Sequence, residues 1–141
     1  MEEVKHYYKI GLLALNKEGT KFLVIEKFRG DVGYMEYQMP GGQIEKETEI
    51  DCLRRETKEE LACDIKRESI AYLGKYDGSA AGGGLLTMTL YKGELIGDPK
   101  PSSEIKSLHW IGKEYQNDLR VSEFIRTRIF PDLISKGVLK G

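Results

Sequence analysis

A short stretch near the middle of the chain constrains its fold more than any other. Met-Pro-Gly-Gly at 39–42 predicts a tight turn, and the pattern of 48–61 predicts an amphipathic helix. In such a helix Glu56, Glu59 and Glu60 stand at i, i+3 and i+4, so their side chains are neighbours on one face. The sequence therefore predicts a helix that presents three carboxylates beside a glycine turn.

The same helix also has an apolar face. At about 100° per residue, a stripe offset from the acids by about a quarter turn contains Ile50, Leu53, Thr57 and Leu61. Thr48 precedes the helix as a candidate N-cap. One side of the helix is therefore expected to pack against the protein, while the adjoining side stays available to a metal ion.

An excess of acids around this helix points to a cation. Residues 45–60 contain seven acids and four bases, whereas a helix selected only for solubility would more often interleave the signs. Mg²⁺ is usually held by one or two carboxylates together with phosphate oxygens of a substrate. The pattern favours a site for a divalent cation and a polyphosphate. A solvated acidic surface, which is the common state of a single glutamate, is the alternative.

The spacing of these residues resembles the signature of the Nudix hydrolases, G-x5-E-x7-R-E-U-x-E-E-x-G-U, in which U is a bulky apolar residue. The residues at its first glycine and its charged positions are Gly41, Glu47, Arg55, Glu56, Glu59 and Glu60. The match covers about a sixth of the chain and is highly specific. The resemblance implies an α/β fold, the Nudix α/β/α sandwich around a mixed β-sheet. It also implies hydrolysis of a nucleoside diphosphate linked to another group, with Mg²⁺ or Mn²⁺.

The chain departs from the signature in two respects. Thr57, Ala62 and Cys63 replace an apolar residue, the closing glycine and a second apolar residue. Because alanine does not adopt the left-handed conformation freely, we expect the helix to end differently at Ala62. In many relatives the second glycine of the pair opens the spacing, whereas Gly41 is the first, so the loop before Glu47 is one residue short.

The resemblance implies a role for each residue of the signature. The metal ligands would be Glu56, Glu59 and Glu60, with the Gly41 carbonyl as a further ligand. Arg55 would orient the site by pairing with Glu47 or with an acid of the helix.

A general base for the attacking water is expected from the helix or from a later loop. Glu59 or Glu60 could serve, because a carboxylate close to the metal can accept a proton from water. Glu104, just before the strand-like 106–111, resembles an acid that some members of the family supply from a later loop. A solvated loop acid is the other interpretation of Glu104.

Substrate contacts are expected near the ends of neighbouring strands. Lys27 and Arg29 follow a buried strand, where related enzymes often place cations on phosphates. Gly42 adjoins the acids, Tyr37 could stack on a base and Asn117 could form a hydrogen bond with one. Ordinary exposed or packed side chains are the alternative for each of them.

The lead-in Tyr-Gln-Met-Pro-Gly-Gly at 37–42 resembles nucleoside triphosphate pyrophosphohydrolases of the MutT-like type. The first hypothesis is therefore cleavage of a (deoxy)nucleoside triphosphate, including an oxidised one, to monophosphate and pyrophosphate. An ADP-ribose or nucleotide-sugar pyrophosphatase is the second. A non-catalytic Nudix-like module that binds a nucleotide is a third, although a binder has no need for a self-repelling acid cluster.

Composition and charge fit one domain spanning 1–141. A net charge of −1 gives no general attraction to nucleic acid or to an anionic membrane. The expected partner is a small nucleotide, and a homodimer is left open. Cys52 and Cys63 suggest neither a zinc site nor a disulfide, which favours a reducing compartment. The polar start has no signal-peptide core, and the longest apolar run, 10–15, cannot span a bilayer, so we expect a cytoplasmic protein.

Strands and helices are expected to alternate along the chain. The predicted strands are 7–15 and 21–27, joined as a hairpin by a turn at 16–20, and then 37–39, 70–75, 85–93 and 107–111, with a loop at 28–33. The glycine-rich segment 77–84 is predicted to be a hairpin loop, with a lid over the cleft as its functional alternative. A helical region at 121–134 should be interrupted at Pro131, and Trp110 should lie in the core.

Overall fold

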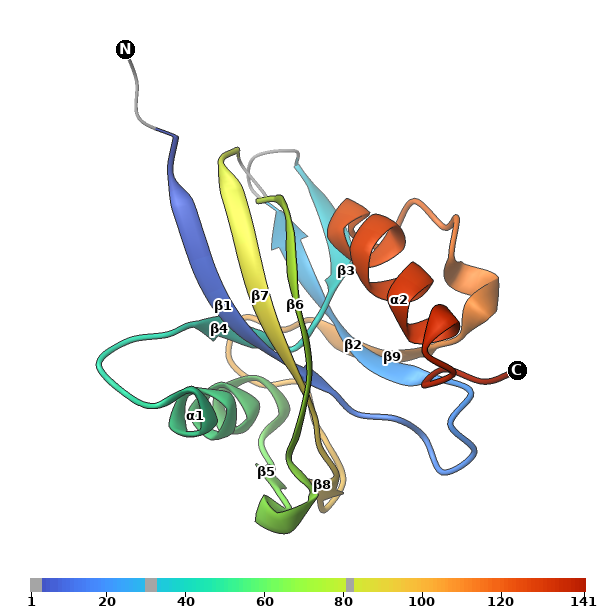
Figure 1. Ribbon diagram of the computed structural model, residues 1–141. Helices are drawn as coiled ribbons and strands as arrows, with labels where there is room; N and C mark the ends of the chain where they lie inside the picture. The colour runs from blue at the N-terminus through green and yellow to red at the C-terminus, as the bar shows by residue number, and fades with distance from the viewer. Residues whose placement is uncertain (1–3, 30–32, 81–82) are drawn as a thin grey trace.

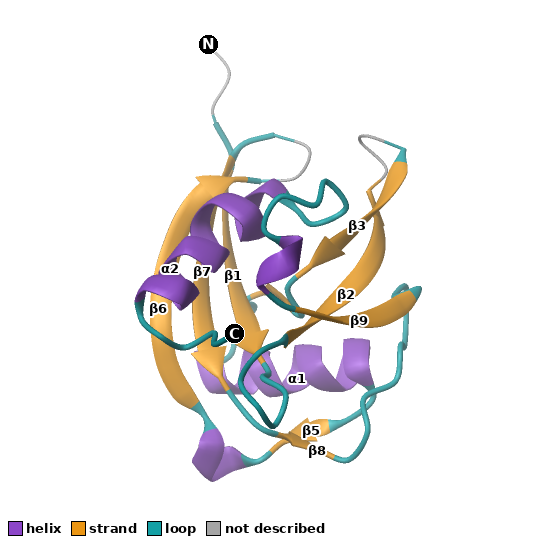
Figure 2. Cartoon of the chain, turned by 90° about the vertical axis from the view of Figure 1, so that its right-hand side faces the viewer, coloured by secondary structure: helices purple, strands orange, loops and turns teal. Residues whose placement is uncertain are grey.

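Helices cover both sides of the strands in the computed structural model, which describes residues 4–29, 33–80 and 83–141. Helix α1 (Glu49–Leu61) lies on one side, and the π-helical turn η3 (Ile125–Ile129) with helix α2 (Phe130–Ser135) lies on the other (Figures 1 and 2). The predicted α/β/α sandwich is confirmed. Across the described ranges, no helix is long and apolar enough to cross a membrane.

Within the described residues, the strands form three sheets. They are β1 (His6–Leu13), β2 (Phe22–Arg29), β3 (Tyr34–Gln38), β4 (Gly41–Gln43), β5 (Asp64–Ile65), β6 (Ala71–Ser79), β7 (Leu85–Lys92), β8 (Leu95–Ile96) and β9 (Ser107–Ile111). The largest sheet has the order β4-β1-β7-β6 and is mixed, because β1 and β7 are parallel and the other pairs are antiparallel. The second has the order β3-β2-β9 and is antiparallel, and β5 pairs with β8. Short 3₁₀ turns occur at η1 (Arg67–Ser69) and η2 (Lys113–Tyr115).

The apolar run of β2 explains how both helical layers are held to the sheets. Residues 22–25 are all buried, since successive side chains point to opposite faces and both faces are covered. Phe22 packs in the cluster that contains Phe130 of α2, and their rings meet edge to face at 5.2 Å. Leu23 packs in the other cluster, with Leu53 of α1. Each such buried side chain contributes roughly 1.5–3 kcal/mol.

The predicted hairpin of the first two strands exists only at its turn. Leu15 and Phe22 form an isolated antiparallel bridge, and the Asn16 side chain accepts the backbone N–H of Thr20 at 2.8 Å. Beyond the turn, β1 lies between β4 and β7, and β2 lies between β3 and β9. The hairpin prediction was wrong for the length of the strands, because each strand is paired on both edges within a different sheet.

The predicted acidic helix is confirmed as α1. Thr48 is its N-cap, and the Thr48 side chain accepts the backbone N–H of Asp51 at 3.2 Å. Leu53, Thr57 and Leu61 of the apolar stripe are buried. The helix therefore presents its acids from a fixed base.

The predicted glycine turn is instead a short strand. Gly41–Gln43 forms β4, antiparallel to β1, with Gly41 opposite Gly11, and the chain bends at Pro40. A Cβ atom at Gly41 would lie 2.1 Å from the carbonyl oxygen of Ile10. The turn prediction was wrong because the glycine permits close approach of β4 to β1.

Helix α1 ends at Ala62, which adopts the left-handed conformation with φ of 54° and ψ of 32°. Its backbone N–H donates to the carbonyl of Lys58 at 3.1 Å. The expectation that alanine would change this exit was wrong. Leu61 and Ile65 are buried on either side and fix the path of the chain, which outweighs a strain of about 1–2 kcal/mol.

The C-terminal helical region continues through the proline. The chain is helical over 123–135, and the backbone N–H of Phe130 donates to the carbonyl of Ile125 in a π-helical turn. Pro131 lies in the first turn of α2, where its missing N–H costs little. The predicted interruption at Pro131 was wrong because the wider turn before it lets the helix continue.

The later strands contain one confirmed prediction and one wrong one. β6 and β7 pair as a hairpin up to Ser79 and Leu85. The first three residues of 77–84 therefore end β6, and the loop follows them. Residues 81–82 of this loop, like 30–32 of the earlier predicted loop, lie outside the described ranges. Trp110, on the edge strand β9, is 40% exposed rather than in the core, whereas its neighbour Ile111 is fully buried.

The strain at Ala62 is testable by substitution. Ala62→Gly should raise the free energy of unfolding by about 0.5–1 kcal/mol, because glycine adopts this conformation without a Cβ penalty and loses only part of the gain through unfolded-state entropy. Urea denaturation measures the change. Ala71→Gly, in the extended strand β6, is the control and should destabilise the protein. An unchanged or lower free energy of unfolding in Ala62→Gly would contradict strain at the helix exit.

An ion pair between α1 and β5 should make stability depend on pH. Arg54 donates to both carboxylate oxygens of Asp64, at 3.3 and 3.0 Å, and this lowers the pKa of Asp64 from 3.8 to about 2. Because the folded pKa is the lower one, the stabilisation is present above about pH 4 and is lost as the pH falls toward about 2. Asp64→Asn should therefore be less stable than the parent protein at neutral pH, with a difference in urea midpoint that shrinks below about pH 4. A difference that does not change with pH would refute this linkage.

Candidate active site

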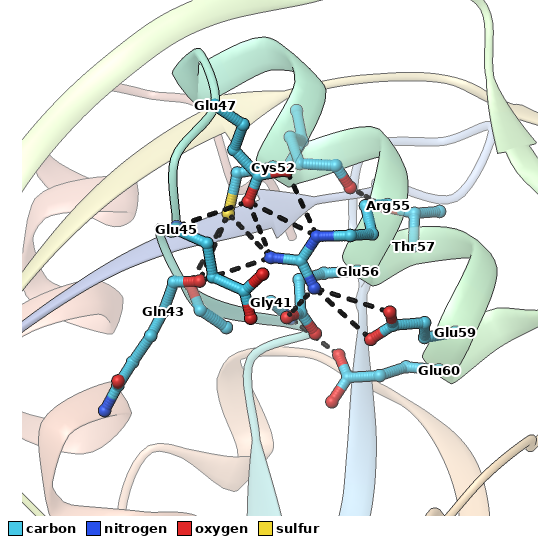
Figure 3. Close-up of polar contacts among 12 residues, drawn as sticks. Gly41, Gln43, Glu45, Glu47, Cys52, Arg55, Glu56, Thr57, Glu59 and Glu60 are labelled. Atoms are coloured by element: carbon cyan, nitrogen blue, oxygen red, sulfur yellow. Dashed lines mark hydrogen bonds and ion pairs between the residues drawn. The ribbon is translucent and has the colours of Figure 1, made fainter.

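The three acids of α1 face β4 across a gap that exists because Gly42 has no side chain. Figure 3 shows Glu56, Glu59 and Glu60 projecting from the helix on the side of Gly41. A Cβ atom at Gly42 would lie 2.3 Å from the carboxylate of Glu56. Glycine at this position therefore makes room for the Glu56 carboxylate beside the strand.

Gly41 holds one of the acids directly. Its backbone N–H donates to Oε1 of Glu60 at 2.7 Å. Its φ of 145° is one that residues with a side chain rarely adopt. The register of β4 on β1 thus fixes both a hydrogen-bond donor and the place of the Glu60 carboxylate.

Arg55 connects the loop before the helix to the acids (Figure 3). Its guanidinium donates to Glu47 through Nη2 at 2.7 Å and through Nε at 3.1 Å. The Nη1 group donates to Glu56 at 2.9 Å and reaches Glu59 at 3.4 Å. These bonds raise the pKa of Arg55 and lower that of Glu47. The shortened loop therefore still delivers Glu47 to the arginine.

Burial changes the electrostatics of the acids. Glu60 is 6% exposed, and burial raises the pKa of Glu60 to about 7. Burial also raises the pKa of Glu56, against the opposing effect of Arg55. Desolvated carboxylates that lie close together are stabilised by a positive charge, which a divalent cation can supply.

The donor set fits an open metal site rather than a closed cage. Carboxylate oxygens are the ligands that hard cations such as Mg²⁺ prefer. In the described part of the chain, no three aspartate, glutamate, histidine or cysteine side chains lie together as a group that could hold a metal ion. Arg55 holds Glu56 and Glu59 in this arrangement. Mg²⁺ keeps several waters and uses phosphate oxygens, so one or two carboxylates from among Glu56, Glu59 and Glu60 would suffice as protein ligands.

A cavity of about 310 Å³ adjoins the acids. Besides the acids and the glycines of β4, its lining includes Lys9, Lys27 and Glu104. The Lys27 ammonium lies 3.0 Å from the carboxylate of Glu104, whose side chain is 68% exposed. Glu104 therefore stands at the rim of this cavity, paired with a cation. We call this the acidic cavity.

A second cavity of about 120 Å³ continues from the first and shares Lys9, Lys27, Gly41 and Glu60 with it. Its apolar lining includes Met39, Leu86, Met88 and Phe124. Its polar lining includes Arg29, Glu36 and Gln38. We call this the inner cavity. The two cavities form one cleft, with the acids at one end and a recess of mixed polar and apolar lining at the other.

The structure brings some of the predicted substrate residues to this cleft and not others. Lys27 lines both cavities, Gly42 the acidic cavity and Arg29 the inner cavity. Tyr37 lines neither, since it is buried and stacks on His109 at 4.4 Å on the other face of β3. Asn117 lines neither and is exposed in a turn after η2. The structure therefore does not bring these two residues to the cleft.

Among the cleft residues that sequence reasoning missed are Lys9, Glu36 and Gln38. Lys9 lines both cavities, and burial and the neighbouring Lys27 lower its pKa. Glu36 and Gln38 line the inner cavity. A signal was available in each case, because Lys9 begins an otherwise apolar strand segment and the other two alternate around the buried Tyr37.

Comparisons with known proteins agree with this geometry. A family model described as the NUDIX domain matches residues 5–121. A MutT protein from Methanosarcina mazei Go1 is structurally similar, with a TM-score of 0.75 and 19% identity over 97% of this chain and 99% of that one. A NUDIX hydrolase from Nitrosomonas europaea has a TM-score of 0.64 and 21% identity, over 78% of this chain and 74% of that one. The E. coli ORF135 protein has a TM-score of 0.73 and 16% identity, over 94% of each of the two chains. At these identities the structures show a shared fold. No curated protein sequence matches the chain significantly.

The space at Gly42 is expected to be essential for the acids. In Gly42→Ala the new methyl group must displace the Glu56 carboxylate, and a shift of about 1 Å at a reacting centre can lower kcat about 10²-fold. Gly74→Ala is the matched control, because its Cβ would crowd the Tyr76 hydroxyl at 2.9 Å in a strand away from the cleft. Thermal unfolding should report similar stability for both variants, and turnover should separate them. Normal turnover in Gly42→Ala would show that this close approach is dispensable.

Proposed function

Because the chain belongs to the NUDIX family and is a pyrophosphohydrolase, we propose that it cleaves a (deoxy)nucleoside triphosphate, oxidised ones included, to monophosphate and pyrophosphate. The observation that supports this most is the two-part cleft, in which the cavity beside the acids joins a recess of mixed polar and apolar lining, and Lys9 and Lys27 line both. Such a cleft suits a ligand with a charged end and a ring. Divalent cations are used in this family, and we propose Mg²⁺ or Mn²⁺ here.

The acids would bind the cation, and the lysines would bind the phosphates. Glu56, Glu59 and Glu60, with the Gly41 carbonyl, would hold the cation, which when bound neutralises phosphate oxygens and lowers the pKa of a coordinated water. Lys9 and Lys27 line both cavities of the cleft. They are placed to balance the charge of phosphates that lie across the two cavities.

Arg55 is a positioning residue in this mechanism. Its bonds to Glu47 anchor the guanidinium, and its bonds to Glu56 and Glu59 hold these carboxylates toward the cleft. A preorganised arrangement needs no reorganisation when charge develops in the reaction. Arg55 therefore contributes by orientation and is not expected to touch the reacting phosphorus.

A carboxylate must accept the proton of the attacking water, and we assign this to Glu59. Its side chain is 53% exposed and so open to solvent, whereas Glu60 is buried and bonded to Gly41. Glu104 lies at the rim, where it is paired with Lys27 at 3.0 Å and stands outside the ligand cluster. Glu60 and Glu104 are the alternatives for the proton acceptor.

Glu59→Gln should lower kcat by about 10²-fold or more while leaving the fold intact, since it removes a principal acid–base or electrostatic group. Asp51→Asn, an exposed change on the same helix, is the matched control and should keep near-normal kcat. Steady-state kinetics with Mg²⁺ gives the comparison. Near-normal kcat in Glu59→Gln, together with a large loss in Glu104→Gln, would move the proton acceptor to the rim.

A substrate panel tests the proposed reaction. Nucleoside triphosphates, oxidised nucleotides, ADP-ribose and nucleotide sugars are compared with Mg²⁺ and with Mn²⁺, and products are separated by chromatography. We expect the highest kcat/KM with a triphosphate, giving monophosphate and pyrophosphate. Preference for ADP-ribose or a nucleotide sugar would overturn the substrate assignment. Tight nucleotide binding without any product at any metal concentration would indicate a binding module.

A further inference from the structure

The inner cavity contains a charged group that the hydrolytic cluster does not use. Glu36 is 4% exposed, and its Oε2 accepts Nη1 of Arg29 at 2.8 Å. Its Oε1 accepts Nε2 of Gln38 at 3.1 Å. The three residues come from β2 and β3 and line the recess beyond the lysines.

Stability alone does not account for a charge at this place. A buried ion pair loses several kcal/mol of hydration per ion, and apolar residues of similar volume are often at least as stable. Much of the surrounding wall is apolar, including Met39, Leu86 and Met88. Polar groups that converge among apolar side chains in a cavity are a usual arrangement for orienting a ligand.

The β2–β3 register aims these groups into the cleft. Lys27 pairs with Glu36 and Ile25 pairs with Gln38, so the four side chains share one face of the sheet. Lys27 also lines the acidic cavity. A ligand whose phosphates lie at Lys27 would therefore place its next group beside Glu36 and Gln38.

We propose that Glu36 and Gln38, held by Arg29, read the base of the substrate and select one whose edge presents N–H donors, as guanine does with N1–H and its 2-amino group. The proposal rests on the proposed function and narrows its substrate class. An ionised carboxylate only accepts hydrogen bonds and has about four lone-pair sites. Arg29 and Gln38 occupy two of them, which leaves acceptor capacity for a ligand.

Glu36 also fixes the orientation of the Gln38 amide. Because a carboxylate can only accept, the NH₂ group of Gln38 must face it, and the carbonyl end of the amide faces elsewhere as a second acceptor. Two neighbouring acceptors match two neighbouring N–H donors. The cavity volume of about 120 Å³ is well above the ~10–15 Å³ that a single water needs, and Phe124 adds a ring to the apolar wall.

The pair dGTP and dITP tests the reading directly, because the two differ only in the 2-amino group. The wild-type protein should favour dGTP in kcat/KM by about tenfold or more, since a hydrogen bond to a charged group is at stake. In Glu36→Gln this ratio should fall toward one, because an amide can donate as well as accept and no longer fixes Gln38. Glu68→Gln, an exposed change in η1, is the matched control and should keep the wild-type ratio.

A purely structural role gives a different result. Glu36→Gln would then lower kcat/KM for both nucleotides equally and leave their ratio unchanged, which overturns the proposal. If loss of the Arg29 pair prevents folding, Gln38→Met keeps that pair, and its ratio should also fall toward one. A ratio of kcat/KM for dGTP to that for dITP near one in the wild-type protein would also overturn the proposal. So would a Gln38→Met variant that keeps the wild-type ratio.

Product binding separates this inference from the proposed reaction. Calorimetry with dGMP and dIMP reports base recognition without hydrolysis. If no triphosphate is cleaved, the proposed reaction fails, yet binding of dGMP about tenfold tighter than dIMP would still support the reading by Glu36 and Gln38. If triphosphates are cleaved and the two monophosphates bind equally, the reaction stands and this inference is overturned.

Discussion

The close approach of strand β4 to helix α1 is the constraint on which the cleft depends. Gly41 and Gly42 carry no side chain at the two points where β4 meets β1 and the helix acids. The backbone N–H of Gly41 then bonds Glu60, and the free space at Gly42 receives Glu56. The acid cluster is thus set by strand pairing as much as by the helix that carries it.

Packing elsewhere offsets the cost of this arrangement. Like charges on one helix face repel, and a buried carboxylate such as Glu60 loses hydration. The apolar stripe of α1, with Leu53 and Leu61 fully buried, anchors the helix to the sheets and makes these costs tolerable. Arg55 compensates part of the repulsion through its bonds to Glu56 and Glu59. The packed layers therefore stabilise the fold, whereas the charge repulsion and lost hydration in the cleft destabilise it.

Local signals predicted the parts of this site that lie within one element. Helical spacing and the Thr48 cap predicted α1 and the shared face of its acids. Sequence patterns were insufficient where partners distant in sequence decide the outcome. β4 replaces the predicted turn because β1 pairs with it, and Tyr37 lies against His109, away from the cleft, because the β2–β3 register points its neighbours into the cleft. Lys9 and Glu36 were missed because their role depends on strands that meet only in the folded chain.

The most direct test of the account is the position of a cation in the crystal. A crystal soaked with Mn²⁺ and a non-hydrolysable nucleoside triphosphate analogue gives an anomalous signal that locates the ion. The account predicts the ion among the carboxylates of Glu56, Glu59 and Glu60, with the phosphates of the analogue beside it. An ion bound elsewhere, with those carboxylates facing only solvent, would contradict it.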